Sequence, residues 1–402
     1  MSGSMELKAQ PAGKRIVSID RMRGFSLLGI FLVNMISFHS PYFYIDPENW
    51  WQGTLNLVTY RFIDIFVQAS FYPLFAMLFG YGLVILRERT LQKGISFTPL
   101  ALRRLSILLL MGLLHAFFIW EGDILITYAV CGFVFLFLIG WNARRLLIAG
   151  FILYIVPNLL LLFMLGAADA MQGGSEFTMY DQEAATQAMM AYQTGSFAEV
   201  TEQRVTEWYK NNDLIGFIFY LITILPLFMI GAGAAKLRLF ENVESKRLKM
   251  AKYAIALVLA GLLIKSLPYL MDRTLGTDYA QDAFGGAMLA MAYALFIALA
   301  SEKRTFDKLL APLEAAGRLS ISNYLFQSIV ATLIFYSYGL GYYGKISIFA
   351  GSVLALSIYA FQLAASTLYI KRYYYGPVEW LWRSGTYMKR QRFKKEDGSW
   401  EN

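Results

Sequence analysis

Long apolar stretches recur along nearly the whole chain and alternate with short polar stretches. A helix needs about 20 mostly apolar residues to cross a lipid bilayer. Ten stretches meet this requirement, near residues 24–43, 62–86, 104–121, 123–141, 146–166, 214–235, 252–271, 283–300, 319–338 and 347–369. The pattern therefore predicts an all-α fold, a polytopic bundle of about ten transmembrane spans.

The distribution of basic residues predicts how these spans are oriented. Cytoplasmic connections of membrane proteins carry an excess of lysine and arginine. If the N-terminus is cytoplasmic, 30 of the 36 basic residues lie in segments on that side, five lie in connections on the other side, and Lys265 lies within the seventh span. Both termini are therefore expected in the cytoplasm.

The chain is expected to form one membrane domain over residues 1–402, with an N-terminal part at about 15–166 and a C-terminal part at about 214–385. A basic cytoplasmic tail follows at 386–402. The segment 167–213 between the two parts is polar and carries eight acidic residues, Glu176 among them. We expect it to be helical and to lie outside the bilayer, either as a solvated connector or as a lid.

The composition agrees with a membrane location and argues against several kinds of site. Only 16% of the residues are charged, compared with roughly 25% in soluble domains. The net charge of +8 is divided among short clusters between apolar runs, which argues against nucleic acid as a partner. With one cysteine, Cys131, and two histidines, no metal and no permanently bound cofactor is expected. The lipid bilayer is the expected partner, and a homo-oligomer is compatible with the sequence.

The first group of polar residues at membrane depth lies at the first span. Asp20, Arg23 and Gly24 open this span, and Asn34 lies within it. Eleven residues make three helical turns, so Arg23 and Asn34 share one face about 16 Å apart. Arg23 could bind a phosphate and Asn34 could line the same groove. An interfacial anchor and a packing amide are the structural alternative.

A second group lies near the outer ends of the first four spans. Its members are His39, Arg61, Asp64, His115, Glu121 and Asp123. These side chains could converge on one pocket, in which Arg61 and Asp64 pair on one helix face. A histidine oriented by a carboxylate suits general-base catalysis and also proton-coupled transport. A histidine that bonds to a helix carbonyl is the structural alternative.

A third group opens the ninth span and consists of Arg318, Asn323 and Gln327. The two amides are four residues apart on one helix face, where they contact either a ligand or a neighbouring span. Beyond the tenth span, Glu379 lies among tryptophans that suit a membrane interface. This carboxylate is expected to need a cationic partner, such as Arg383 or an arginine of a neighbouring loop.

Several motifs resemble the YeiB family of bacterial membrane proteins, also called domain of unknown function 418. They are Asp20-Arg-Met-Arg23-Gly24 with Asn34, Phe62-Ile-Asp64 with Pro73-Leu-Phe-Ala-Met-Leu-Phe-Gly80, Arg103-Arg104 with Gly112-Leu-Leu-His115 and Gly122-Asp123, Gly317-Arg318 with Ser322-Asn323-Tyr324 and Gln327-Ser328, and Gly376-Pro-Val-Glu379-Trp-Leu-Trp-Arg383. The resemblance covers the chain almost end to end. It implies a multi-pass protein of the bacterial plasma (inner) membrane, and it implies no defined activity.

The Asp-x-x-Arg-Gly segment is also distantly similar to transmembrane acyltransferases, which include heparan-α-glucosaminide N-acetyltransferase and the acyltransferase type three family. This similarity covers about the first third of the chain. It implies that acyl-CoA, such as acetyl-CoA, is presented from the cytoplasm and that an acceptor is modified at the outer face. The type three enzymes carry a histidine where this chain has Asn34. His115 or His39 would then have to supply the base.

Two function classes follow. In an acyltransferase, the CoA phosphates would be bound by arginines, the pantetheine path would be lined by amides, and His115, oriented by Asp123 or Asp64, would deprotonate a small-molecule, lipid or glycan acceptor. The arginines are Arg23, Arg103, Arg104 and Arg318, and the amides are Asn34, Asn323 and Gln327. The alternative is a transporter or exporter that uses the buried His, Asp and Arg side chains as a solute or proton site. A structural or regulatory membrane subunit is a third alternative.

Overall fold

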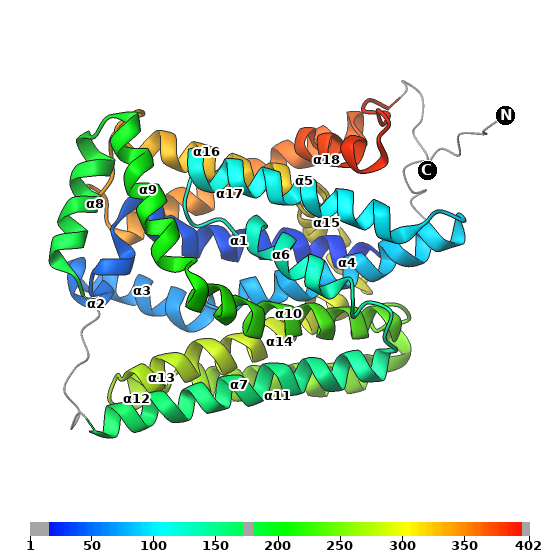
Figure 1. Cartoon of the computed structure of the whole chain (residues 1–402). Coiled ribbons are helices and arrows are strands. Elements are labelled where there is room, and N and C mark those ends of the chain that lie inside the picture. Colours follow the sequence, from blue (N-terminus) through cyan, green and yellow to red (C-terminus); the bar gives the residue numbers. More distant parts are fainter. Residues whose placement is uncertain (1–15, 172–179, 396–402) are drawn as a thin grey trace.

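Helices that run side by side along one axis make up the part of the chain that the computed structural model describes, residues 16–171 and 180–395 (Figure 1). They cover all ten predicted spans: α1 (Val17–His39), α3 (Thr54–Phe66) with α4 (Phe71–Gln92), α5 (Phe97–Phe118), α6 (Leu125–Phe135), α7 (Ala143–Met171), α10 (Leu214–Lys236), α11 (Arg247–Lys265), α14 (Ala287–Ser301), α16 (Ser320–Phe335) and α17 (Ile348–Arg372). These described ranges contain no strand, only an isolated bridge between Tyr373 and Lys394. The all-α fold is confirmed.

Shorter helices complete the described chain. They are η2 (Tyr42–Tyr44), α2 (Pro47–Trp50), α8 (Gln182–Thr194), α9 (Phe197–Asn211), η3 (Glu244–Lys246), α12 (Leu267–Leu270), α13 (Leu275–Ala280), the π-helix η4 (Gln281–Gly286), α15 (Arg304–Arg318) and α18 (Pro377–Tyr387). The segment 167–213 contains α8 and α9, as expected. The first 15 residues, Glu176 and the end of the basic tail lie outside the described residues.

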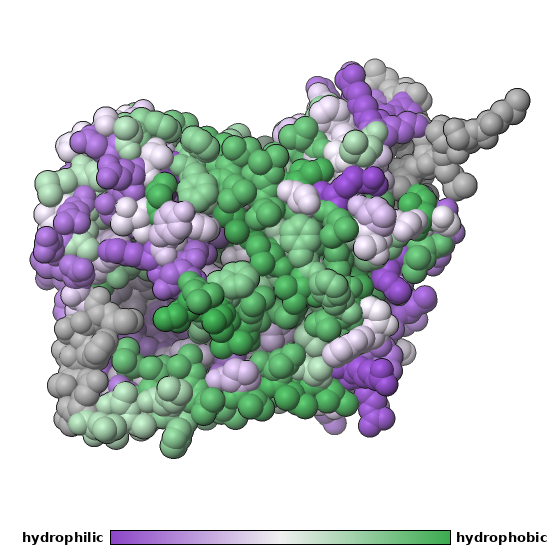
Figure 2. Space-filling model, viewed as in Figure 1, coloured by the Kyte–Doolittle hydropathy of each residue, from purple (hydrophilic) through white to green (hydrophobic). Residues whose placement is uncertain are grey.

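Seven helical segments in the described chain are long and apolar enough to cross a membrane. They are Val17–His39, Thr54–Gln92, Phe97–Phe118, Ala143–Met171, Leu214–Lys236, Leu275–Ser301 and Ile348–Arg372, while α6 and α16 are apolar but shorter. Figure 2 shows a broad hydrophobic surface between hydrophilic ends. A membrane-embedded bundle is therefore supported, whereas the count of ten spans and the side of the termini stay predictions.

The central helix of the bundle is α1, which contacts α4, α14, α15, α16 and α17. Two glycines allow α15 to approach it closely. A Cβ atom at Gly24 would lie 2.0 Å from the Leu313 carbonyl oxygen, and one at Gly317 would lie 1.8 Å from the Asp20 carbonyl oxygen. Segment 303–318, which connects two of the predicted spans, is therefore a helix packed into the bundle. Its apolar residues alternate with charged ones at helical spacing, so it folds as α15 and packs against α1.

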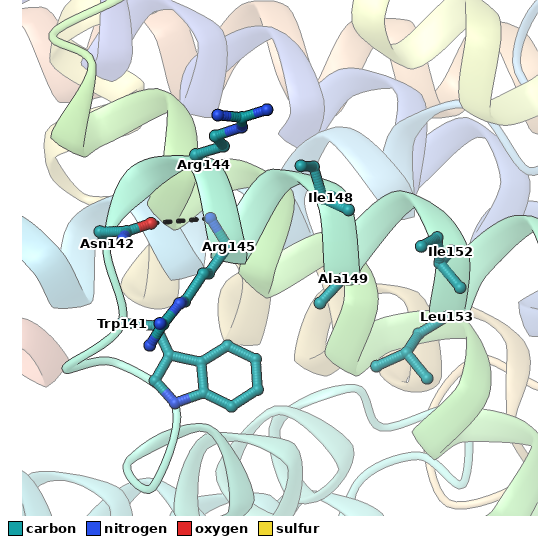
Figure 3. A pocket seen from close by; sticks show the side chains of 8 residues that line it. All are labelled: Trp141, Asn142, Arg144, Arg145, Ile148, Ala149, Ile152 and Leu153. Atoms are coloured by element: carbon teal, nitrogen blue, oxygen red, sulfur yellow. Dashed lines mark hydrogen bonds between the residues drawn. The ribbon is translucent and has the colours of Figure 1, made fainter.

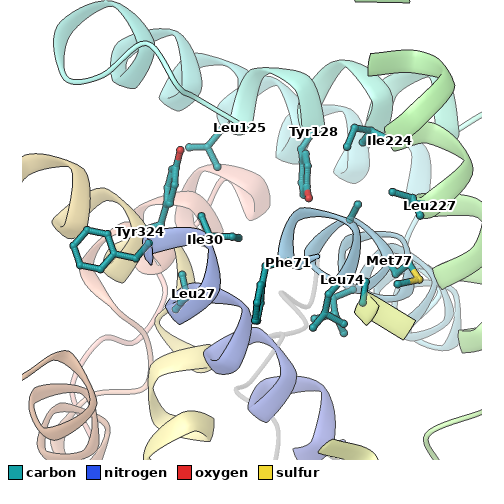
Figure 4. Packing of buried hydrophobic residues seen from close by; sticks show 14 of the residues in the cluster. Leu27, Ile30, Phe71, Leu74, Met77, Leu125, Tyr128, Ile224, Leu227 and Tyr324 are labelled. Atoms are coloured by element: carbon teal, nitrogen blue, oxygen red, sulfur yellow. The ribbon is translucent and has the colours of Figure 1, made fainter. Parts of the chain in front are cut away.

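Side chains from five helices meet in the apolar core beside α1 (Figure 4). Ile30 of α1, Phe71 of α4, Tyr128 of α6, Leu227 of α10 and Tyr324 of α16 are all less than 9% exposed. The Tyr128 hydroxyl donates to the Tyr72 carbonyl oxygen at 3.0 Å, so its polar end is satisfied inside the core. This packing holds α4 and α16 on opposite sides of α1.

A wide, open surface depression follows the start of α7, and all the side chains that line it come from residues 141–153 (Figure 3). Ile148 and Ile152 on this face are about half exposed. Trp141, Arg144 and Arg145 lie at its polar end, which is the arrangement of an interfacial anchor. We assign this face to lipid contact rather than to a ligand.

The close contact between α1 and α15 yields a prediction about stability. In Gly24→Ala or Gly317→Ala, the new methyl group meets backbone atoms that cannot rotate away, so α15 must shift. We expect each variant to lose about 1–3 kcal/mol of stability, measured as an earlier thermal transition of the protein in detergent. The control is Gly166→Ala on α7, where nothing lies within 4 Å of the added atom. Equal transitions in all three variants would contradict the packing role.

Candidate functional site

A buried hydrogen-bonded pair, His115 and Asp123, lies at the link between α5 and α6. His115 Nδ1 lies 2.8 Å from Asp123 Oδ1, and the two side chains are 1% and 0% exposed. The other carboxylate oxygen accepts from the backbone N–H of Ile126 at 2.7 Å, so Asp123 is fixed at the start of α6. A side chain at Gly112 would come within 2.9 Å of Asp123 Oδ2. The motif glycine therefore leaves room for this carboxylate.

The second ring nitrogen of His115 has no hydrogen-bond partner among the described residues. The ring lies against Tyr324, with 5.1 Å between ring centroids, and against Trp120 at 6.4 Å. When a carboxylate accepts from Nδ1–H, the neutral imidazole keeps Nε2 as a proton acceptor. Asp123 thus orients His115 as a base, and the proton-accepting nitrogen of the ring, Nε2, forms no hydrogen bond with the described residues.

A small cavity of about 130 Å³ lies next to this pair. Its lining includes Ile30, Asn34, Gln68, Tyr72, Gly122, Ile124 and Tyr324. Gly122 and Ile124 flank Asp123 in the chain, and Tyr324 is the residue that packs against His115. The side-chain amide of Asn34 forms no hydrogen bond with any described residue, and the side-chain oxygen of Gln68 is buried without a partner. The cavity therefore presents polar groups with unused hydrogen-bonding capacity.

Asp64 does not join this pair. Its Oδ2 accepts from the Tyr269 hydroxyl and from Gln281 Nε2, both at 2.6 Å. Arg61 bonds instead to Glu48, with 3.2 Å between Nε and Oε1, so the predicted Arg61–Asp64 pair is wrong. The two side chains leave the helix in different directions. Asp64 points into the bundle and is 5% exposed, whereas the Arg61 side chain is 46% exposed.

His39 also lies apart from His115. It is fully buried at the end of α1, with its ring centroid 5.7 Å from those of Trp51 and Phe335. Neither ring nitrogen has a hydrogen-bond partner among the described residues. The outer polar residues thus divide into separate clusters, and the single pocket considered from the sequence does not form, because these side chains leave their helices in different directions.

The predicted cytoplasmic arginines lie on α1, α5 and α15. Two of these arginines, both on α5, contact α18. Arg103 Nε donates to the Thr386 carbonyl oxygen at 3.0 Å, and the Arg104 guanidinium lies 3.5 Å from the Trp382 ring centroid. Arg23 pairs with Asp20 at 3.2 Å, and its side chain is 29% exposed. Arg318 ends α15.

The amides of the third group are used inside the bundle. Asn323 Nδ2 donates to Ser366 Oγ at 3.1 Å, and Gln327 Nε2 donates to Gln362 Oε1 at 2.8 Å. Gln362 in turn donates to the Asn323 carbonyl oxygen at 2.9 Å. These bonds join α16 to α17, which corresponds to the structural alternative for Asn323 and Gln327.

Glu379 caps the N-terminus of α16 rather than pairing with Arg383. Its Oε1 accepts from the backbone N–H groups of Ile321 at 2.7 Å and Ser322 at 3.0 Å. The Arg383 guanidinium lies over the Tyr375 ring, 4.5 Å from its centroid. A helix N-terminus carries unsatisfied amides and a partial positive charge, so it serves as the partner that the buried carboxylate needs.

Sequence reasoning missed an ion pair between the fully buried Lys265 and the partly exposed Asp282. Lys265 Nζ lies 3.0 Å from Asp282 Oδ1 and 3.1 Å from the Gln68 carbonyl oxygen. The signal was present, because Lys265 lies inside a predicted span and a charge at that depth needs a partner. Its partner is 17 residues away across the α12–α13 turn, where the sequence pattern gives no pairing.

Comparison with known proteins gives relatives that match nearly the whole chain. The uncharacterized protein YxaH of Bacillus subtilis (strain 168) is 34% identical over 397 residues, covering 95% of this chain and 97% of that protein. The uncharacterized protein YeiB of Escherichia coli (strain K12) is 27% identical over 394 residues, covering 93% and 96%. The chain belongs to the YeiB family, DUF418. The family model, described as a protein of unknown function, matches residues 234–389.

The DUF418 match includes the elements that cap and close the candidate site. It covers Lys265, Asp282, Tyr324 and Glu379, whereas His115 and Asn34 lie N-terminal to it. A third relative, an uncharacterized 39.9 kDa protein in the amylase 3' region of Bacillus acidopullulyticus, is 25% identical over 395 residues, or 94% of this chain and 95% of that protein. The full-length matches therefore cover both halves of the site.

The helical hairpin of α8 and α9 covers the C-terminal end of α5 in this DUF418 protein. Arg204 of α9 is fully buried and donates to the Phe117 carbonyl oxygen at 3.0 Å, two residues from His115. Glu207 accepts from the Tyr192 hydroxyl at 2.7 Å. Glu121, beyond the end of α5, is 6% exposed beside this pair. Burial raises the pKa of both glutamates, and the charge of Glu207 raises the pKa of Glu121 further.

These glutamates predict a pH-dependent hairpin. A carboxyl whose pKa is raised by burial favours the docked state at acidic pH, and this stabilisation is lost as the pH rises through the raised pKa. We expect amide exchange of residues 182–211, corrected for intrinsic rate, to become faster between pH 6 and pH 9.

The variant Glu121→Gln should reduce this pH dependence, because it removes one of the two buried ionisable groups. Glu183→Gln, at an exposed position on α8, is the control and should behave like the parent. Exchange of the hairpin that does not change with pH in the parent protein would contradict the coupling.

Proposed function

We propose that this protein is a membrane-bound acyltransferase in which His115 acts as the general base. The observation that carries the proposal is the unused Nε2 of a carboxylate-oriented, buried histidine that packs against Tyr324, a residue that lines a small cavity with Asn34 and Gln68. Such a base contributes roughly 10²–10⁴-fold to a rate when it removes a proton from a nucleophile. A histidine with only a packing role would not need the Asp123 carboxylate as a partner.

The reaction would proceed by transfer of an acyl group from a CoA thioester to an acceptor hydroxyl or amine. His115 Nε2 takes the acceptor proton while the acceptor atom forms a bond to the thioester carbonyl carbon. The C–S bond then breaks, and the leaving thiolate receives the proton from His115. Asn34 is the candidate donor to the oxyanion, since it lines the cavity and its side-chain amide is unused.

The size of the cavity limits the acyl group. A volume of about 130 Å³ holds a few water molecules or a short acyl group, and it does not hold a long chain. The nucleotide end of CoA would remain near Arg23 and Arg104, about 16 Å from Asn34 along α1. We therefore propose acetyl-CoA as donor, a small-molecule, lipid or glycan acceptor, and a location in the bacterial plasma membrane.

The two histidines allow a matched test. In a Cys131→Ser background, acetyl-CoA is added to the protein in liposomes, with water as the acceptor, and release of the CoA thiol is followed. We expect His115→Ala to lower the rate by about 10²-fold with acetyl-CoA binding retained, because only the base is lost. His39→Asn should keep the parent rate, and palmitoyl-CoA should not react.

Absence of acetyl-CoA binding, or an unchanged rate in His115→Ala, would contradict the proposal. Transport is the second candidate, and the interrupted helices with the Lys265–Asp282 pair favour it, since such breaks often form solute and ion sites. A pH-gradient-driven flux in the same liposomes that persists in His115→Ala and is lost in Asp282→Asn would favour transport instead.

A further inference from the structure

One wall of the Asn34 cavity is an interruption between α3 and α4. The backbone N–H groups of Val67 and Gln68 both bond to the Ile63 carbonyl oxygen at 2.8 Å, and Ala69 has a φ of 56°. A positive φ is uncommon for a residue other than glycine. Val67, Gln68 and Ala69 all line the cavity. The interruption therefore sets the shape of this wall.

The interruption releases backbone carbonyl groups that need partners inside the bundle. The Phe66 carbonyl oxygen accepts from the Tyr293 hydroxyl at 2.8 Å. The Gln68 carbonyl oxygen accepts from Lys265 Nζ at 3.1 Å. In addition, Gly286 of the π-helix approaches so closely that a Cβ there would lie 2.3 Å from the Ala69 carbonyl oxygen. The π-helix and the end of α11 together hold the interrupted segment.

Using the buried ammonium of Lys265 as the donor to one carbonyl group carries a large free-energy cost. The Lys265 side chain is 0% exposed, and burying an ammonium costs several kcal/mol before its partner is counted. Asp282, which belongs to the π-helix, compensates this cost, since its Oδ1 lies 3.0 Å from Lys265 Nζ. Arg273, another cation whose charge acts on Asp282, is engaged by Asp278 at 3.1 Å and does not replace Lys265. The charge of Lys265 therefore has a specific use at this position.

The two sides of the wall differ in access to water. The Asp282 side chain is 41% exposed, whereas Lys265 behind it is 0% exposed. Gln68 lies between this pair and the Asn34 cavity, because its carbonyl oxygen contacts Lys265 and the residue lines the cavity. Asp282 follows α13, at the end of the bundle that carries α8 and α9 (Figure 1). The clamped segment thus lies between the partly exposed Asp282 and the cavity.

We propose that Lys265, supported by Asp282, is a positioning residue that keeps the Asn34 cavity closed toward the end of the bundle that carries α8 and α9. It acts through Gln68, whose carbonyl it holds. Loss of the ammonium leaves that carbonyl with only the Ser70 hydroxyl, at 3.2 Å within the same segment, and removes the bond that ties the segment to α11, so the wall opens. This inference concerns access to the cavity and does not depend on which reaction or solute the cavity serves.

Cysteine accessibility tests the proposal, because Cys131 is the only cysteine of the chain. In a Cys131→Ser background, Asn34→Cys is exposed to a membrane-impermeant maleimide added from the outer side of cells. We expect slow labelling in this parent and at least about tenfold faster labelling after Lys265→Met, since the loss of a charged hydrogen-bond donor from a buried position shifts a two-state equilibrium by about that factor or more. Asp282→Asn should also label faster.

A double variant separates positioning from charge balance. If Lys265 served only to neutralise Asp282, the variant Lys265→Met/Asp282→Leu would restore slow labelling, because no unpaired charge remains. On the present account it stays fast, since the Gln68 carbonyl still lacks the ammonium that ties it to α11. Labelling of Glu202→Cys, on the exposed face of α9, checks that the reagent has equal access in every variant. The matched control for Lys265→Met is Lys345→Met, which replaces an exposed lysine.

Monodisperse elution and a thermal transition show that each variant is folded. Labelling of Asn34→Cys at the parent rate in both Lys265→Met and Asp282→Asn would overturn the proposal. Slow labelling restored in the double variant would overturn it as well. Neither outcome involves acetyl-CoA, so a failure here is distinct from a failure of the proposed acyltransferase activity.

Discussion

The constraint on which this structure depends is that a backbone group released by a helix interruption in an apolar bundle must find its partner inside the protein. The break at 67–70 is satisfied by Tyr293 and Lys265. The break at Leu319 starts α16, whose first amides are capped by the buried carboxylate of Glu379. Costly buried charges therefore occur where the helices are interrupted.

The two interruptions meet at one place, and this is why the cavity exists. Residues of the first break form one wall, and Tyr324, one turn into α16 after the second break, forms another. The short link between α5 and α6 brings Gly122 and Ile124, which flank Asp123, to the same cavity. An uninterrupted bundle would fill this space with apolar side chains. The breaks thus place polar atoms, an oriented base and a small volume at membrane depth.

Much of the fold could be predicted from the sequence, because apolar length and basic connections are properties of single segments. Helices occupy every predicted span, and the His115–Asp123 contact follows from a link too short to separate the two residues. Partners from distant segments could not be predicted. The contacts of Asp64 with Tyr269 and Gln281, and the role of Gly317 against α1, depend on how helices pack, which one sequence does not state.

The central claim is that an acyl donor reaches the Asn34 cavity next to His115. A density map of the protein with a non-hydrolysable acetyl-CoA analogue, in which the thioester sulfur is separated from the carbonyl, tests this most directly. The account predicts elongated density along α1, between α5 and α16, with its nucleotide near Arg23 and Arg104 and its acyl end in the cavity. No density at saturating analogue, or a water-filled route through both ends of the bundle, would contradict it.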